Sequence, residues 1–143
     1  YDTIAIHNWC ISNIDRCLKN LRDMKEDYSD DLIGEAIAFI EENYSSVISL
    51  SDISGKVNLS SFYFTKLFKA KTGMTFVEYL TNYRMKVAKK LLGENMEMKI
   101  QDVGEHVGYT DYKYFCKCFR KQTGVTPASY RSQLSPGREK DNR

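Results

Sequence analysis

The sequence carries one motif twice, about 50 residues apart. With one extra residue in the second copy, residues 50–80 align with residues 100–131. Identical pairs at matching positions include Asp52 and Asp102, Val57 and Val107, Phe64 and Phe115, Lys66 and Lys117, Phe68 and Phe119, Thr72-Gly73 and Thr123-Gly124, Thr75 and Thr126, and Tyr79 and Tyr130. Because solenoid arrays need three or more repeats, a motif present only twice indicates a duplicated supersecondary unit.

Each copy has the pattern of two short helices joined by a tight turn. Apolar residues recur three or four apart on either side of a break at Asn58 or Gly108, and these are residue types that tolerate left-handed backbone. Ser54 and Gly104 are small, as is needed where two helices cross closely. The expected N-caps are Ser49, Ser60 and Thr110, and the expected C-terminal stops are Gly73 and Gly124. The sequence therefore predicts helix-turn-helix (HTH) units over about 49–73 and 99–124.

A longer amphipathic helix is expected between the two units, over about 75–93. Thr75 and Glu78 form a capping box at its start, and its apolar stripe is Phe76, Tyr79, Leu80, Tyr83, Val87 and Leu91. Pro127 after Thr126 is typical of the first position of a last short helix. These elements predict an all-α domain over 30–134 with two HTH subdomains joined by a linker helix.

Charge is segregated along the chain, although the net charge is only +2. Residues 1–59 hold five basic and eleven acidic side chains, whereas residues 60–93 hold seven basic side chains and one acidic, Glu78. Residues 111–131 hold five basic side chains against Asp111 alone. Two basic regions separated by an acidic stretch suit two separate contacts with a polyanion, although solvated helix faces are the alternative.

The second helix of each unit has an outward face that suits the major groove of DNA. Lysine can donate to guanine, threonine can read either base edge, and an aromatic ring can touch a thymine methyl group. The predicted base-facing residues are Phe62, Thr65 and Lys66 in the first unit and Tyr112, Lys113, Cys116 and Lys117 in the second. The predicted phosphate contacts are Ser60, Ser61, Lys69, Lys71, Thr110, Arg120 and Lys121. Phe62 and Tyr112 could instead be packing residues, and Cys116 a small filler.

Residues 100–109 (IQDVGEHVGY), 114–120 (YFCKCFR) and 123–131 (TGVTPASYR) resemble the signature of AraC/XylS-type transcription regulators. The resemblance covers about 32–134, and it implies seven helices with two HTH units that bind promoter DNA and activate or repress transcription. It places the base-facing positions on the residues named above. One departure is that family members usually have alanine where Ser54 and Gly104 stand.

Residues 1–29 precede the resemblance and are expected to form a connector helix. Its apolar residues follow a 4-3 spacing and are Cys10, Ile14, Cys17, Leu21, Met24 and Tyr28. This spacing fits either a coiled-coil seam for a homodimer through residues 1–28 or a helix folded against its own domain. Because the first residue is Tyr1 and not methionine, we expect a longer parent chain with an N-terminal sensor or receiver domain. RNA polymerase is the expected partner at the promoter.

Other classes of protein fit the sequence poorly. Neither histidine stands in a catalytic motif and there is no phosphate-binding glycine loop, so we do not expect an enzyme. We expect no cofactor or metal, because His7, Cys10 and Cys17 do not converge when they are strung along one helix. We expect a cytoplasmic protein with reduced cysteines and a disordered tail over 135–143. The remaining rival is a helical protein-interaction module that has lost DNA binding.

Overall fold

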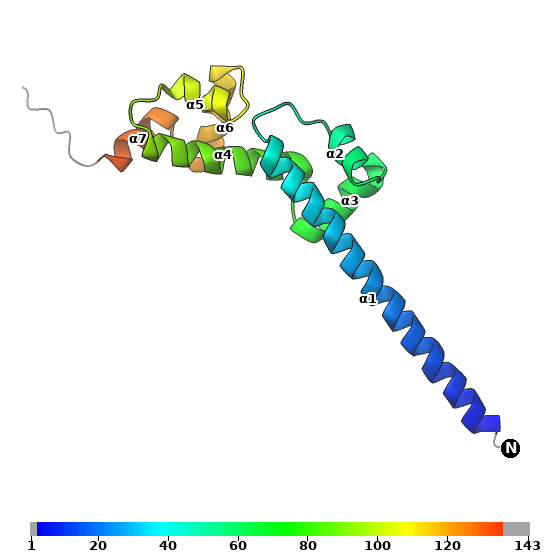
Figure 1. Cartoon of the computed structure of the whole chain (residues 1–143). Helices are drawn as coiled ribbons and strands as arrows, with labels where there is room; N and C mark the ends of the chain where they lie inside the picture. The colour runs from blue at the N-terminus through cyan, green and yellow to red at the C-terminus, as the bar shows by residue number, and fades with distance from the viewer. Residues whose placement is uncertain (1–2, 136–143) are drawn as a thin grey trace, which may run out of the picture.

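The computed structural model describes residues 3–135, and it confirms the all-helical prediction (Figure 1). Over these residues the chain forms seven helices and no strand. They are α1 (Thr3–Asn43), α2 (Leu50–Lys56), α3 (Ser61–Thr72), α4 (Phe76–Glu94), α5 (Ile100–His106), α6 (Tyr112–Thr123) and α7 (Pro127–Leu134). The two HTH units are α2 with α3 and α5 with α6, and α4 is the linker helix. The tail expected after Ser135 lies outside the described residues.

Most helix boundaries follow the expected capping chemistry. Ser49 and Thr75 form capping boxes with Asp52 and Glu78, and Ser60 accepts the amide of the third residue of α3. The C-terminal stops Gly73 and Gly124 are left-handed, with φ of 78° and 81°. The turns within the two HTH units are left-handed as well, at Asn58 (φ 54°) and Gly108 (φ 98°). Each of these conformations was predicted from the residue type alone.

The N-cap predicted for α6 is wrong by one residue. Asp111, and not Thr110, caps this helix, and its carboxylate accepts hydrogen bonds from the amides of Lys113 (2.9 Å) and Tyr114 (3.2 Å). The extra residue of the second copy lies in this turn, so alignment with Ser60 placed the cap one position early. Two free amides are satisfied by one ionised group, which a threonine hydroxyl cannot do as well.

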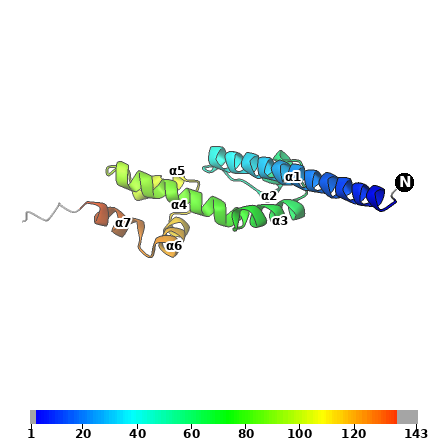
Figure 2. The same ribbon diagram turned by 90° about the horizontal axis from the view of Figure 1, so that it is seen from below.

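The protein has two hydrophobic cores that share α4. The first lies between the C-terminal part of α1, α2, α3 and the start of α4, around the fully buried Phe64 and Phe68. The second lies between the rest of α4, α5, α6 and α7, around Phe115 and Phe119. We call these parts the first and second subdomain. Figure 2 shows them at the two ends of α4, with α3 beside one end and α6 beside the other.

Close packing within each subdomain explains the small residues of the repeat. Ser54 is buried and its hydroxyl hydrogen-bonds to that of Ser61 at 3.1 Å. A Cβ atom on Gly104 would lie 2.9 Å from the ring of Phe115, so α5 and α6 touch at this point. The two helices of each unit therefore cross with almost no side chain between them.

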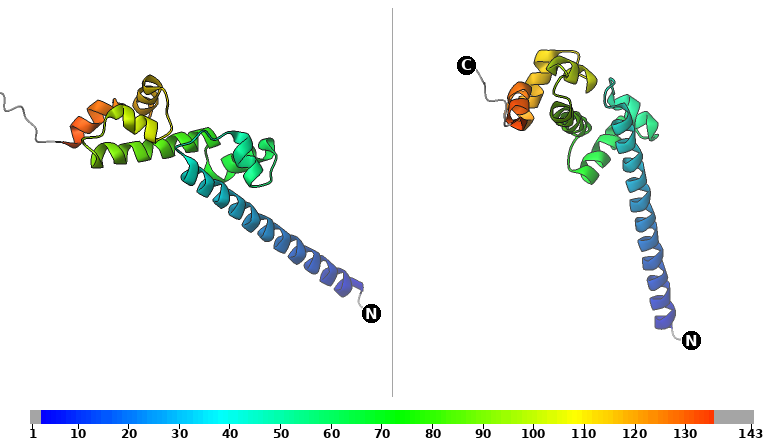
Figure 3. Two further views of the ribbon diagram at one scale, coloured as in Figure 1. Left: turned by 45° about the horizontal axis from the view of Figure 1, so that its top comes forward. Right: turned by 60° about the vertical axis from the view of Figure 1, so that its left-hand side comes forward.

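The connector segment is not a separate helix. It is the N-terminal part of α1, which runs unbroken for 41 residues. The buried residues of α1 are Leu32, Ile33, Ala36 and Ile40, all near its C-terminal end. The segment before residue 29 projects away from the other helices (Figures 1 and 3). None of the described helices combines the length and the apolar character needed to cross a membrane.

Candidate nucleic-acid interface

The outward face of α3 exposes all three residues predicted to face bases. Phe62 is 72% exposed, and Thr65 and Lys66 are exposed beside it. The ammonium of Lys66 lies 4.3 Å from the centroid of the Phe62 ring, which is within cation–π distance. The Thr65 hydroxyl donates to the carbonyl of Ser61 at 2.8 Å. Phe62 is therefore not a packing residue, and this face combines an apolar ring, a hydroxyl and a cation.

The outward face of α6 is similar, with one difference. Tyr112, Lys113 and Lys117 are exposed, whereas Cys116 is half-buried and packs against the second core. A hydrogen bond with the Cys116 thiol raises the pKa of the Tyr112 hydroxyl. This contact ties the Tyr112 side chain to its own helix. Cys116 therefore combines a packing contact with a position beside the exposed face.

The residues predicted to contact phosphate lie at the ends of these two helices. Lys69, Arg120 and Lys121 are exposed in the last turns of α3 and α6. Thr110 is exposed just before the α6 cap. Ser60 and Ser61 are at the start of α3, where the Ser60 hydroxyl accepts the Tyr63 amide at 3.2 Å. Every member of the two predicted sets therefore lies on or beside α3 or α6.

Lys71 differs from the other predicted phosphate contacts because it has an internal partner. Its ammonium lies 2.7 Å from a carboxylate oxygen of Asp30 on α1. This hydrogen bond raises the pKa of Lys71. The ion pair is partly solvated, since the two side chains are 30% and 65% exposed. Lys71 therefore lies where α1 crosses α3, and its positive charge is partly balanced by the Asp30 carboxylate on α1.

Two tyrosines on these helices were missed in the sequence analysis. Tyr63 and Tyr114 are 45% and 55% exposed, and they occupy matching positions of the repeat. Tyr114 lines a groove between α4 and α6 together with Val77, Thr81 and Lys121. The same residue type stands at this position in both copies of the repeat, and that match could have identified the two tyrosines from the sequence. Most of the other aromatic matches between the copies are buried core residues.

A polar contact links the linker helix to α6 beside this groove. The side-chain amide of Gln122 donates to the side-chain oxygen of Asn82.

In the part of the chain that the structure describes, no group of three or more His, Cys, Asp or Glu side chains could hold a metal ion. The four cysteines are free thiols. The site therefore consists of two basic helix faces held by a common helix.

Comparison with known proteins identifies the family. A family model described as a helix-turn-helix domain matches residues 53–133. The regulatory protein PocR of Salmonella typhimurium is 34% identical over 106 residues, which are 74% of this chain and 35% of PocR. This chain spans less than half the length of the curated relatives PocR, a response regulatory protein of Staphylococcus epidermidis and YtdP of Bacillus subtilis.

Solved structures of response regulators share the fold. The C-terminal domain of AraT from Geobacillus stearothermophilus superposes with a TM-score of 0.70 at 29% identity, covering 78% of this chain and 93% of that domain. The C-terminal domain of yesN from Fusobacterium nucleatum superposes with a TM-score of 0.65 at 39% identity, covering 71% and 96%. The resemblance found in the sequence is confirmed: this chain belongs to the AraC-type helix-turn-helix transcription regulators and carries the DNA-binding domain of that family.

Proposed function

We propose that the chain reads DNA by placing α3 and α6 in two successive stretches of major groove. The observation that carries this proposal is the duplication of one basic, exposed face at the two ends of α4. Neither α3 nor α6 contains an acidic residue. A phosphate-lined groove would repel a carboxylate, so a helix that enters it is expected to lack one. The roles of individual side chains below belong to this proposal.

Base recognition is assigned to the exposed middle of each helix. Lys66, Lys113 and Lys117 are long enough to donate to guanine O6 or N7, and the Thr65 hydroxyl can serve either base edge. Apolar contact with a thymine methyl group is assigned to Phe62, Tyr112 and Cys116. Since Lys66 already lies over the Phe62 ring, these two side chains approach the groove as one unit.

Phosphate contacts are assigned to residues that flank these faces. The cations are Lys69, Lys71, Arg120 and Lys121, and the hydroxyl groups are those of Ser60, Ser61 and Thr110. Backbone amides at the start of α3 add to them, because a helix N-terminus favours an anion, whereas at the start of α6 the Asp111 carboxylate already accepts two amides. Such contacts hold the protein in register on the duplex without reading sequence.

The test is selection from a random duplex library at about 0.15 M salt, a concentration at which non-specific binding is weak. Wild type is compared with Lys66→Ala and Lys117→Ala. Lys19→Ala is the matched control, because Lys19 is also an exposed lysine and lies on the projecting part of α1. We expect wild type to enrich a bipartite motif, each of the first two variants to relax a different half, and the control to change neither half.

Two outcomes contradict the proposal. Either no motif is enriched, or the Lys66 and Lys117 variants enrich the same motif as wild type. Salt dependence separates DNA binding from a protein-interaction role. The logarithm of the binding constant is expected to fall by about 0.9 per neutralised phosphate for each tenfold rise in salt. A protein contact has a much weaker dependence.

We also propose the partners of the longer chain. A sensor or receiver domain precedes α1, which is supported by the response-regulator descriptions of AraT and yesN. Residues 1–28 pair with a second copy, RNA polymerase is the partner at the promoter, and the protein acts in the cytoplasm. Transcription from a promoter carrying the selected motif, with purified polymerase and the full-length protein, tests the polymerase contact. No change in transcript level would contradict it.

A further inference from the structure

We propose that Arg84 is a positioning residue for DNA recognition, because its guanidinium joins the two subdomains and fixes the angle between α3 and α6. Arg84 lies on α4 and touches no residue assigned to DNA. The effect of Arg84 on DNA recognition rests on the proposed function, whereas its role in joining the two subdomains does not. Neither the charge pattern nor the repeat singles it out, since its counterpart would fall beyond the second copy.

The guanidinium bonds to the first subdomain on one side. Its Nε donates to the carbonyl of Tyr44 at 2.7 Å, and its terminal nitrogen donates to the carbonyl of Ser46 at 2.8 Å. These carbonyls directly follow the end of α1 at Asn43. The C-terminal end of a helix carries partial negative charge and unpaired carbonyls, so a cation is favoured there. A planar guanidinium can serve two acceptors at once, which an ammonium cannot do in the same geometry.

The same group packs against the second subdomain on its other side. Its central carbon lies 5.4 Å from the ring centroid of Tyr109, a buried residue of the second core. The backbone of Gly108, in the second subdomain, also lies against Arg84 and Tyr44. A Cβ atom there would lie 2.9 Å from the Tyr44 carbonyl oxygen and 3.1 Å from the Arg84 guanidinium. The chain after α1 and the turn before α6 therefore meet at Arg84 with no space between them.

The helix contacts explain why such a junction is needed. Helices α1, α2 and α3 pack with one another and α3 packs on α4, while α5, α6 and α7 pack on α4. The two sets share α4, so each could rock about this helix unless something joins them directly. Tyr44 assists Arg84, because it packs against residues of both cores and its ring meets that of Tyr83 edge-on at 5.3 Å. When the angle between α3 and α6 is fixed before binding, no conformational entropy is lost in orienting the two helices for their two grooves.

The test compares Arg84→Met with Arg84→Lys and with a matched arginine. Arg84→Met removes both hydrogen bonds and the charge but keeps an unbranched apolar side chain, whereas Arg84→Lys keeps the charge but replaces the planar fork of donors with a single ammonium group. The matched control is Arg131→Met. Arg131 donates to the carbonyls of Leu92, Asn95 and Met98, all within the second subdomain. Its loss therefore perturbs one subdomain without freeing it from the other.

The first measurement needs no DNA. Residual dipolar couplings of backbone amides report whether the two subdomains share one alignment tensor in solution. We expect a common tensor for wild type and Arg131→Met, different tensors for Arg84→Met, and intermediate behaviour for Arg84→Lys. Well-dispersed amide spectra show that each variant is folded. A common tensor in folded Arg84→Met overturns the proposal, whatever the protein does on DNA.

The second measurement uses the selected motif with its two halves moved apart or together by two base pairs. Such a shift turns one half about the duplex axis by roughly 70° relative to the other. We expect wild type to lose at least about tenfold in affinity, or about 1.4 kcal/mol, and Arg84→Met to lose less than about threefold. Equal losses in the two proteins contradict the role of Arg84. Failure of wild type to select any motif contradicts the proposed function, and the alignment tensors then still decide the role of Arg84.

Discussion

At the residue scale, the ion pair between Lys71 and Asp30 is the contact with the most direct bearing on DNA binding. The sequence places Lys71 in a basic region and therefore predicts a phosphate contact. It gives no sign of the partner, because Asp30 lies 41 positions earlier in a segment rich in other acidic residues. Only the crossing of α1 over α3 brings the two side chains to 2.7 Å. Pairings between distant elements of this kind cannot be derived from charge patterns.

We predict that Asp30→Asn strengthens DNA binding at low salt. The substitution leaves the Lys71 ammonium without its internal partner and removes a negative charge beside α3, so one more phosphate can be neutralised. The slope of log affinity against log salt is expected to steepen by about 0.9. Binding measured by fluorescence anisotropy over a salt series gives this slope. The loss of stability is expected to be under about 1 kcal/mol, since the pair is partly exposed.

The adjacent Asp31 supplies the control. Asp31→Asn removes the same charge one position along the helix, but the carboxylate that pairs with Lys71 is that of Asp30 and stays in place. We expect it to leave the slope unchanged. If the two variants steepen the slope equally, general repulsion by α1 is the cause and the ion pair has no specific effect.

At the scale of single helices, most of the fold could be predicted because each boundary depends on residues close in sequence. Serine and threonine N-caps, capping-box carboxylates and glycine stops act within four residues of the helix end. The start of α6 was misplaced because Thr110 and Asp111 are both residue types that cap helices well. Which of the two becomes the N-cap depends on the backbone conformation of the preceding turn. The continuity of α1 across the boundary at residue 29 was not predicted, for another reason. That boundary was placed just before the family resemblance begins, and no glycine or proline at residue 29 breaks the helix.

The corrected cap gives a prediction about stability. Asp111→Ala is expected to lower the free energy of unfolding by about 1 kcal/mol, because the amides of Lys113 and Tyr114 lose their acceptor. Thr110→Ala is expected to change it by less than about 0.5 kcal/mol, as for an exposed residue that caps nothing. Urea denaturation followed by circular dichroism measures these differences. A larger loss for Thr110→Ala than for Asp111→Ala would contradict the assignment of the cap.

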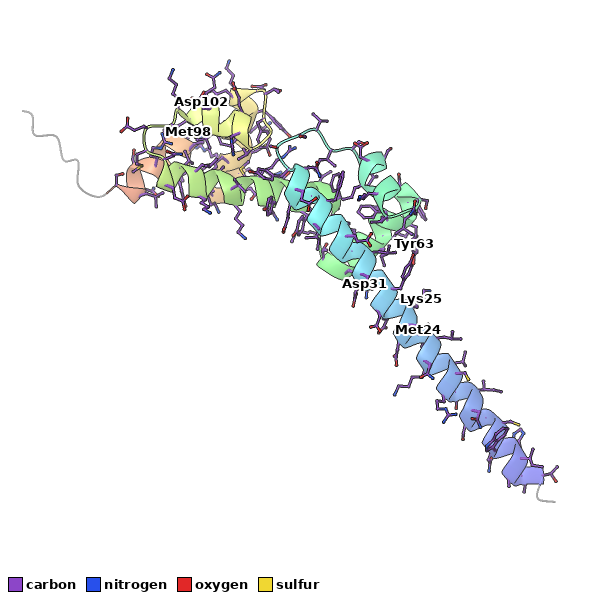
Figure 4. All side chains as sticks on the ribbon, viewed as in Figure 1. Met24, Lys25, Asp31, Tyr63, Met98 and Asp102 are labelled. Carbon is purple, nitrogen blue, oxygen red and sulfur yellow. The ribbon has the colours of Figure 1, made fainter. Side chains whose placement is uncertain are left out.

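At the scale of the whole molecule, the projecting part of α1 is the feature without an intramolecular explanation. Ile14, Leu21, Met24 and Tyr28 are each at least 58% exposed, and Met24 lies well clear of the other helices (Figure 4). Ile11 and Leu18 widen the apolar stripe on one side and are also exposed. In proteins most of the stability of a helix comes from packing of its apolar face. The described part of this segment is therefore not folded against its own domain, which favours the pairing proposed above.

We predict that Leu21→Asp weakens self-association of this chain at least about a hundredfold. Each of two paired copies would lose the burial of a leucine, worth about 1.5–3 kcal/mol, and gain a charge in the seam. Sedimentation equilibrium measures the association constant. Trp9→Asp is the control, because Trp9 is equally exposed but lies off the 4-3 spacing. Equal effects of the two substitutions, or a wild type that is monomeric at high concentration, would contradict the pairing.

Oxidation of the native cysteines tests the orientation of the paired helices. Cys10 and Cys17 are exposed free thiols on the predicted seam. In a parallel pair in register, Cys17 of one copy faces Cys17 of the other, so mild oxidation is expected to give a crosslinked dimer on a non-reducing gel. Cys17→Ser is expected to reduce the yield, with Cys10 forming the remaining bond. An antiparallel pair gives no crosslink between identical positions.

The unbroken course of α1 also means that the number of residues in it sets a rotational phase. Each residue turns a helix by about 100°, so inserting two residues before residue 29 would swing any upstream domain roughly half a revolution around the DNA-binding faces. Seven residues would return it to within about 20° of its starting orientation. Length variants that keep this orientation should therefore differ by nearly whole numbers of turns, as insertions of about 7, 11 or 18 residues do, so that the orientation of anything upstream of α1 is set by a count of residues.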